Sequence, residues 1–334
     1  MSQNTYSSDH LHELAVRALV AHNTSKVNAI LVADALVAAQ IDGHSGHGLS
    51  RMASYCAQSA SGKVDGHAVP ILAEAAPAAV RIDAANGFAF PAMALAVDDL
   101  DMRARKNGIA IATVHRSHHF GVAGYHVEKL ATRGLIGLAF SNSPHAIAPW
   151  GGAKGLFGTN PIAFASPRIS DAPLLIDLSL SKVARGKVMV AAKAGEAIPE
   201  GWALDKDGNA TTDAAAALEG TMVPMGDAKG AALVLMVEIL AAALSGANFG
   251  YEASSFFSAD GPAPGVGHTL IAINPGPLSG DAFGARLEML LNAILDQDDT
   301  RLPGTRRLKA REGVAVNGVP VPDALYAELS GLAG

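Results

Sequence analysis

Cysteine, aromatic side chains and charge are all scarce in this 334-residue sequence. The single cysteine, Cys56, excludes an intrachain disulfide framework and a zinc site built from several thiolates. Charged residues make up 17% of the chain, and 25 Lys and Arg stand against 31 Asp and Glu, so we expect no nucleic-acid partner. The first twenty residues lack the basic and then apolar pattern of a secretion signal. We therefore expect a cytoplasmic globular protein.

Common nucleotide-binding and hydrolase motifs are absent as well. The spacing of Gly43, Gly46 and Gly48 is the reverse of G-x-G-x-x-G, and these glycines follow a predicted helix rather than a strand. The sequence also lacks a P-loop, an H-E-x-x-H and a G-x-S-x-G nucleophile elbow. If this protein binds NAD(P), it does so on a scaffold other than the Rossmann fold.

The apolar residues, 49% of the chain, follow a pattern that predicts an α/β fold. Ser8 or Asp9 is expected to cap a first helix and Ser25 a second one. Short apolar runs predict buried strands at 108–114, 135–141, 174–177 and 269–274, alternating with helices. We expect a helix-covered sheet in a central body over residues 79–278, and a helical layer from both chain ends, 1–78 and 279–334.

The longest apolar stretch covers residues 230–247 and is interrupted only by Glu238 and Ser245. A membrane helix needs about 20 predominantly apolar residues, and a carboxylate in the middle of the bilayer is costly. We therefore predict a buried, close-packed helix here and no association with a membrane.

Histidines cluster in two loops: His44 and His47 flank one, and His115, His118 and His119 lie in the other. Such clusters are compatible with loop polarity, with a metal site, or with acid–base catalysis beside a bound anion. The metal interpretation lacks carboxylate partners near the first loop apart from Asp42, so no metal is expected. Arg51 lies four residues after His47, on the same face of a helix that Gly48 could begin. That pair suits protonation by His47 and a carboxylate held by Arg51, unless Arg51 is an ordinary surface cation.

A glycine-rich segment over residues 143–164 leads into a Gly158-Thr159-Asn160-Pro161 sequence. Glycines allow a backbone to approach a ligand closely, and Thr159 adds a hydroxyl. A plain surface turn explains the same composition equally well.

Eight segments resemble the malate/L-lactate dehydrogenase family that lacks the Rossmann fold. The resemblance implies a mixed-sheet α/β fold, an NAD(P)H-dependent reductase with NADPH favoured over NADH, and a homodimer acting on a small carboxylate-bearing substrate. In order along the chain the segments are 46–51 (GHGLSR), 119–123 (HFGVA), 158–164 (GTNPIAF), 177–181 (DLSLS), 184–187 (ARGK), 229–230 (KG), 235–240 (LMVEIL) and 302–307 (LPGTRR).

The resemblance also implies roles for individual residues. His47 would donate the proton, and Arg51, Thr159, Arg185 and Gly186 would bind the substrate. The cofactor would be held by four segments: His119, Phe120, Gly121, Val122 and Ala123; Asp177, Leu178 and Ser179; Ala228 and Lys229; and Leu302, Pro303, Gly304, Thr305, Arg306 and Arg307.

Two positions depart from the family pattern. The serine that commonly precedes the proton donor is Gly46 here, and the relay aspartate expected near position 187 is Lys187. Ser45, His44 or Lys187 could take over the relay, and the sequence does not choose between them.

The substrate is predicted from a Ser-, Gly- and Pro-rich loop over residues 250–267, which contains Ser-Ser-Phe-Phe at 254–257. This loop is most similar to that of the cyclic-imine reductases, so we predict reduction of Δ1-pyrroline-2-carboxylate to L-proline and of Δ1-piperideine-2-carboxylate to L-pipecolate. A 2-oxo acid or 2-hydroxy acid dehydrogenase, of malate, lactate, sulfolactate or ureidoglycolate type, is the alternative. A ligand-binding protein that has lost catalysis is a more remote one.

Overall fold

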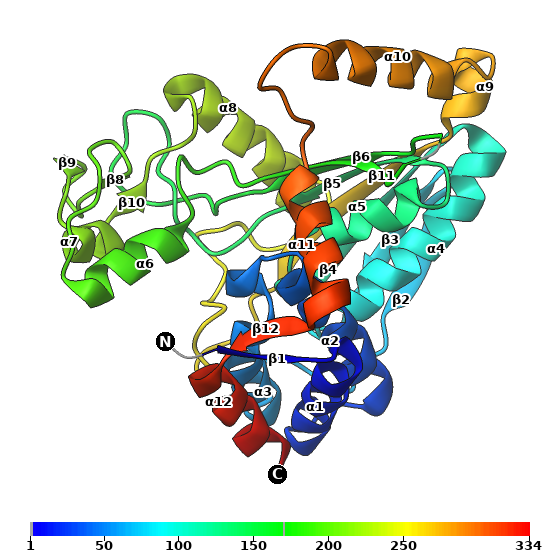
Figure 1. The fold of residues 1–334 in the computed structure, drawn as a ribbon. Helices are drawn as coiled ribbons and strands as arrows, with labels where there is room; N and C mark the ends of the chain where they lie inside the picture. Colours follow the sequence, from blue (N-terminus) through cyan, green and yellow to red (C-terminus); the bar gives the residue numbers. More distant parts are fainter. Residues whose placement is uncertain (1–2, 170) are drawn as a thin grey trace.

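A seven-stranded mixed sheet forms the centre of the computed structural model, which describes residues 3–169 and 171–334 (Figure 1). Its strands lie in the order β2 (Ile71–Ala76), β3 (Ala79–Asp83), β4 (Ile109–Ser117), β11 (Val266–Ile273), β5 (Ile136–Ser141), β6 (Ile162–Ser166) and β7 (Leu174–Leu178). β3 and β4 are parallel, and the other neighbouring strands are antiparallel. All four strands expected from the sequence belong to this sheet, so the prediction of a helix-covered α/β fold is confirmed.

Alternate residues of the strands face two different helical layers. Leu270 and Ala272 of β11 pack with α4 (Ala89–Asn107) and α5 (Ala123–Ala131) on one face. Ile271 points to the other face, where it packs with α8 (Asp227–Glu238) and the π-helical turn Ile239–Ala243 that continues it. Because both faces are covered, the strands are apolar on both sides, which is why the sequence shows continuous apolar runs.

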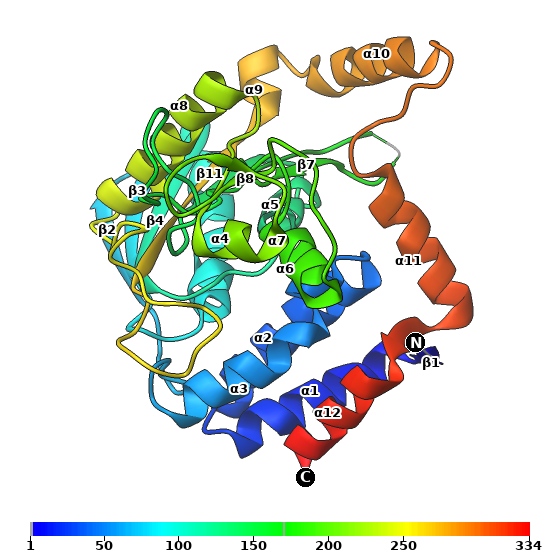
Figure 2. The same cartoon turned by 90° about the vertical axis from the view of Figure 1, so that its left-hand side faces the viewer.

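The two ends of the chain form a helical layer together. β1 (Gln3–Tyr6) pairs antiparallel with β12 (Val319–Pro322), and α1 (Ser8–Ala21) packs against α12 (Asp323–Ala333). α2 (Lys26–Ile41) and α3 (Met52–Ala60) complete this layer, and α11 (Thr305–Asn317) contacts α2 (Figure 2). Ser25 caps α2 as predicted, whereas α1 is capped by Ser7, one residue earlier than expected. The domain boundaries stay a prediction.

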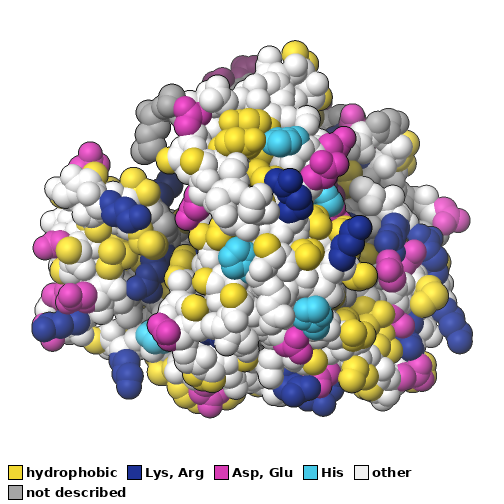
Figure 3. All heavy atoms as spheres, turned by 90° about the horizontal axis from the view of Figure 1, so that it is seen from below, with side chains coloured by type: hydrophobic (Ala, Val, Ile, Leu, Met, Phe, Trp, Pro, Cys, Tyr) yellow, Lys and Arg dark blue, Asp and Glu magenta, His cyan; other side chains and the backbone are white. Residues whose placement is uncertain are grey.

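A small lobe is inserted between β7 and α8. It contains a three-stranded sheet, β9 (Ala210–Thr211), β8 (Ala203–Leu204) and β10 (Thr221–Met222), with α6 (Arg185–Ala194) and α7 (Ala214–Glu219). Figure 3 shows this lobe separated from the rest of the face by a furrow, and acidic and basic side chains are interspersed over that face.

Two apolar helices remain exposed. The prediction that residues 230–247 form a buried helix is wrong for one side, because Leu235, Ile239 and Leu244 are exposed while the opposite side packs on the sheet. α10 (Phe283–Leu295), which follows the short α9 (Pro275–Ser279), stands away from the sheet in both views with most of its apolar side chains exposed (Figures 1 and 2). Among the described residues, no helix is long and apolar enough to cross a bilayer.

Glu238, the carboxylate inside the apolar stretch, joins three distant segments. Its Oε2 accepts a hydrogen bond from Asn160 Nδ2 at 2.7 Å, and its Oε1 accepts from Gly250 N at 2.7 Å and from Asn142 Nδ2 at 3.1 Å. Burial raises the pKa of Glu238, and the three N–H donors oppose that rise. The residue fixes the end of β5, the turn that carries Thr159 and the start of the 250–265 loop.

We expect Glu238→Ala to lower the free energy of unfolding by about 3 kcal/mol, because three buried N–H groups lose their acceptor. Urea unfolding followed by circular dichroism measures the loss. The matched control is Glu252→Ala, which removes an exposed carboxylate that accepts from Phe249 N and should cost less than about 1 kcal/mol. Equal losses in the two variants would contradict the role given to Glu238.

Candidate active site

The loop after α2 places His47 and Arg51 side by side, although not on the helix expected. Residues Ser45–His47 and Leu49–Arg51 form two 3₁₀ turns, and the α-helix begins only at Met52. Gly48 does begin a helical stretch, which is 3₁₀ over Leu49–Arg51 and α-helical from Met52, but His47 lies before it in a separate turn. Gly48 is needed for another reason, because a Cβ there would come within 2.7 Å of Gln40 Oε1 at the end of α2.

The Arg51 side chain is oriented by a backbone carbonyl and by an aromatic ring. Its Nε donates to Gly46 O at 2.7 Å, and the guanidinium carbon lies 4.5 Å from the centre of the Phe257 ring. Neither contact uses the two terminal nitrogens, and no acceptor among the described residues bonds them. The fork is therefore available to a carboxylate, as the spacing of His47 and Arg51 predicts.

His47 stacks on His119, so the two histidine loops meet. Their ring centres are 5.4 Å apart. The Tyr55 hydroxyl lies 2.6 Å from Nδ1 of His119, and burial raises the pKa of Tyr55. Tyr55 therefore keeps its proton, and its hydroxyl shares a short hydrogen bond with Nδ1 of His119. Sequence reasoning missed Tyr55, although it follows Arg51 by four residues on the helix.

The surroundings of His47 favour its neutral form. Burial lowers the pKa of His47 most, and the nearby Arg51 and His44 lower it in the same direction; together they bring it to about 4. The ring is still reachable by solvent. A carboxylate bound to Arg51 would offset that positive charge, so substrate binding and protonation of His47 favour each other.

The relay candidates and the expected substrate residues are dispersed. His44 acts electrostatically on both His47 and Asp177, and so lies near both of them. Lys187 is exposed on α6, and no hydrogen bond or ion pair of the described residues joins it to His47. Arg185 donates to Leu218 O at 2.9 Å within the small lobe.

The Thr159 turn is held by the protein's own backbone and by Ser143. Thr159 N donates to Ser143 Oγ at 3.2 Å, and Thr159 O accepts from Leu180 N at 2.9 Å. A Cβ at Gly158 would lie only 2.1 Å from Ser143 Oγ, so this glycine serves close packing within the chain. The structure therefore does not need a ligand to explain the glycine there.

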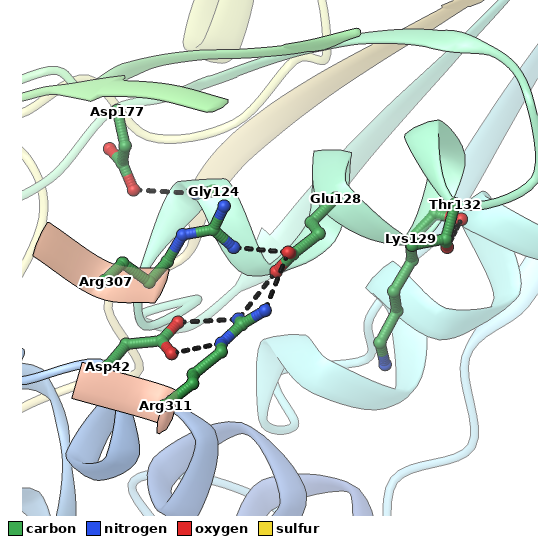
Figure 4. A network of polar contacts seen from close by, with 8 residues as sticks. All are labelled: Asp42, Gly124, Glu128, Lys129, Thr132, Asp177, Arg307 and Arg311. Carbon is green, nitrogen blue, oxygen red and sulfur yellow. Dashed lines mark hydrogen bonds and ion pairs between the residues drawn. The ribbon is translucent and has the colours of Figure 1, made fainter. Parts of the chain in front are cut away.

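Three of the four expected cofactor segments converge on α5. Asp177 accepts a hydrogen bond from Gly124 N at 2.7 Å, which joins the end of β7 to the start of α5 (Figure 4). Arg307 pairs with Glu128 of α5, which brings the 302–307 segment to the same helix. Ala228 and Lys229 are exposed in the first turn of α8.

The side chains around α5 suit an anionic cofactor. Arg307 is 5% exposed, and its Nε and one terminal nitrogen have no partner in the described part of the chain. Arg311, one turn further on, binds both Asp42 and Glu128, while Arg306 is exposed (Figure 4). Buried, unpartnered guanidinium nitrogens bind phosphate oxygens well. The structure thus brings Arg307 and the 119–123 segment to one helix, and their role in holding a dinucleotide stays a prediction, as does that of Gly304.

Comparisons with known proteins identify the family of the chain. The family model described as malate/L-lactate dehydrogenase matches residues 6–330. The chain is 52% identical over 318 residues to a (2R)-3-sulfolactate dehydrogenase (NADP(+)) of Chromohalobacter salexigens, covering 95% of this chain and 94% of that protein. It is 43% identical to a Δ1-pyrroline-2-carboxylate/Δ1-piperideine-2-carboxylate reductase of Pseudomonas putida, covering 93% and 91%.

A solved structure shows the same fold. The Δ1-piperideine-2-carboxylate reductase from Pseudomonas syringae pv. tomato superimposes with a TM-score of 0.94 at 40% identity, over 98% of this chain and 99% of that one. The family model and the full-length relatives lead to one conclusion: the chain is an oxidoreductase that belongs to the malate/L-lactate dehydrogenase family.

Proposed function

We propose that this chain reduces the C2 atom of a small 2-oxo or 2-imino carboxylate with NAD(P)H, and that NADPH is the preferred cofactor. The observation that carries the proposal is the pair of His47 and Arg51, which lie close together with the guanidinium fork unused. The convergence of three cofactor segments on α5 supports it.

The chain's own residues have separate tasks in this reaction. Arg51 holds the substrate carboxylate in a bidentate contact and so fixes the position of C2. The nicotinamide, when bound, supplies the hydride to C2. His47 donates a proton to the oxygen or nitrogen attached to C2 as the double bond becomes single. Tyr55 holds the His119 ring, which stacks on His47, in place through the hydrogen bond to Nδ1.

Two substrate pairs are candidates, each favoured by a different observation. The 52% identity to a (2R)-3-sulfolactate dehydrogenase favours 3-sulfopyruvate and sulfolactate, and NADP as the cofactor. The phenyl rings of Phe256 and Phe257 beside His119 and Arg51 favour the apolar ring of Δ1-pyrroline- or Δ1-piperideine-2-carboxylate. We place sulfopyruvate first, because similarity over nearly the full length weighs more than one aromatic wall.

Loss of nicotinamide absorbance tests the proposal, with purified protein and NADPH or NADH. The substrates are 3-sulfopyruvate, the two cyclic imines, pyruvate and oxaloacetate. We expect turnover with NADPH and at least one of the first three at a kcat/KM of about 10⁴ M⁻¹s⁻¹ or more. Turnover of none of the five would contradict the proposed function and favour a binding protein. Turnover of pyruvate or oxaloacetate alone would support the proposed reduction at C2 and would contradict both preferred substrates.

We also propose a homodimer, because contiguous apolar surface on α8 and α10 is unusual for a monomer. The exposed side chains are Leu235, Ile239 and Leu244 on one surface and Met289 and Leu290 on the other.

Light scattering after gel filtration should give twice the mass of one chain. Ile239→Asp or Leu290→Asp should shift the equilibrium toward the monomer, because each places a charge on an apolar surface. The control is Val316→Asp, an exposed apolar residue on α11. A wild-type protein that is monomeric at micromolar concentration would contradict the proposal.

A further inference from the structure

The end of α3 binds one short stretch of the 250–265 loop through side chains alone. The Lys63 ammonium donates to three backbone carbonyls, those of Ser255 at 2.7 Å, Ser258 at 2.8 Å and Asp260 at 3.0 Å. Lys63 is a residue with only 5% of its surface exposed, so these charge-assisted bonds are shielded from water. No carboxylate pairs with Lys63 among the described residues; its partners are backbone oxygens.

Two neighbours of Lys63 strengthen the attachment. Gln58 Nε2 donates to Phe256 O at 2.8 Å, and Ser61 Oγ donates to Ala259 O at 3.0 Å. Five of the six backbone carbonyls in residues 255–260 therefore accept a hydrogen bond from Gln58, Ser61 or Lys63; the exception is the carbonyl of Phe257. Five bonds from one helix end to six consecutive residues hold that stretch as a rigid block.

The docked stretch presents two aromatic rings to the catalytic residues. The Phe256 ring centre lies 5.1 Å from that of His119 and 5.3 Å from that of His118. The Phe257 ring lies under the Arg51 guanidinium at 4.5 Å and covers one of its two faces. A carboxylate must therefore approach Arg51 at the edge of the guanidinium, where the N–H groups point.

Arg51 and Lys63 lie at opposite ends of the same helix. That helix therefore positions both the carboxylate clamp, Arg51, and the aromatic wall, Phe256 with Phe257, which Lys63 holds. Arg51 immediately precedes α3 (Met52–Ala60), and Lys63 lies three residues beyond its end. We propose that Lys63 is a positioning residue that sets substrate affinity and preference: it docks the 255–260 stretch so that Phe257 orients Arg51 and Phe256 closes one side of the substrate space. This inference rests on the proposed function.

The aromatic wall bears on how tightly each of the two candidate substrates is bound. The Phe257 ring beside Arg51 and the Phe256 ring beside His119 favour a compact, weakly hydrated group on C2, such as the methylenes of a cyclic imine. The sulfonate of 3-sulfopyruvate, which the sequence identity places first, gains nothing from these rings, so the ratio of kcat/KM between the two substrates reports on the wall. Lys63 therefore affects the ratio of kcat/KM between cyclic imines and 3-sulfopyruvate, and loosening the wall should move that ratio toward sulfopyruvate.

The test compares Lys63→Met with the wild type. Methionine keeps most of the side-chain volume and removes the ammonium that three carbonyls share. We expect the substrate KM to rise about tenfold with the NADPH KM changed less than about twofold, since Arg51 loses its fixed orientation while the α5 region is untouched. Hydrogen exchange at the amides of 255–260 should become faster, and Lys63→Arg should restore part of the affinity.

The matched control is Arg103→Met on α4, which removes a cation bonded to Asp99 and to Pro77 O at the β2–β3 turn. It should lower stability and leave the substrate KM and the substrate ratio unchanged.

Phe257→Ala is the second variant and keeps Lys63 intact. It should raise the substrate KM by a factor similar to that of Lys63→Met, and it tests the role of the aromatic wall if Lys63→Met does not fold.

The outcomes separate the two proposals. A wild-type protein that turns over none of the candidate substrates contradicts the proposed function, and this inference with it. An active wild type whose Lys63→Met and Phe257→Ala variants keep the wild-type substrate KM and substrate ratio contradicts this inference alone. An equal rise of substrate KM in Arg103→Met would show a general loss of stability and would also overturn it.

Discussion

The carboxylate of Glu238 accepts N–H bonds from three segments that are far apart in the sequence, and the substrate-facing loops depend on it. Asn142 ends β5, Asn160 belongs to the Thr159 turn, and Gly250 begins the loop that reaches Phe257. A buried carboxylate is costly unless its oxygens are satisfied, and here three donors satisfy them. The same bonds therefore stabilise the core and fix the geometry of the site.

A buried positive charge complements this anchor at the other end of the loop. Lys63 holds residues 255–260 from the helical layer, while Glu238 holds residue 250 from the sheet side. The cofactor segments come together separately, around α5 and the ion pairs of Glu128 with Arg307 and Arg311 (Figure 4).

The sequence pattern predicted many of the helices, caps and strands, because these elements are determined by residues that are close together in the chain. The first helix was expected and buries Leu11, Leu14 and Leu19 as α1, and Ser25 caps α2 as expected. The strand at 269–274 was expected, but its place between β4 and β5 was not, because strand order depends on contacts across the whole chain. The two 3₁₀ turns around Gly48 were missed because they depend on the close approach of Gln40.

Individual site residues could be predicted only where they belong to a sequence motif. His47, Arg51 and His119 were named from the sequence, and the structure brings them together. Tyr55, Lys63 and Glu238 were not named as site residues, because their partners lie elsewhere in the chain; only Tyr55, four residues after Arg51, carries a periodic signal. In the sequence Glu238 was only an interruption in an apolar run, whereas in the structure its carboxylate accepts hydrogen bonds that connect the Thr159 turn to the start of the 250–265 loop.

The central claim is that His47 donates the proton, and the pH dependence of kcat/KM for reduction tests it most directly. With an open-chain 2-oxo acid, kcat/KM should rise about tenfold for each unit of decreasing pH between about 8 and 5.5, because the free-enzyme pKa of His47 is about 4. In His47→Ala this dependence should vanish, and the rate should fall by about 100-fold or more while NADPH binding is retained. A variant that keeps both the rate and the pH profile would contradict the account.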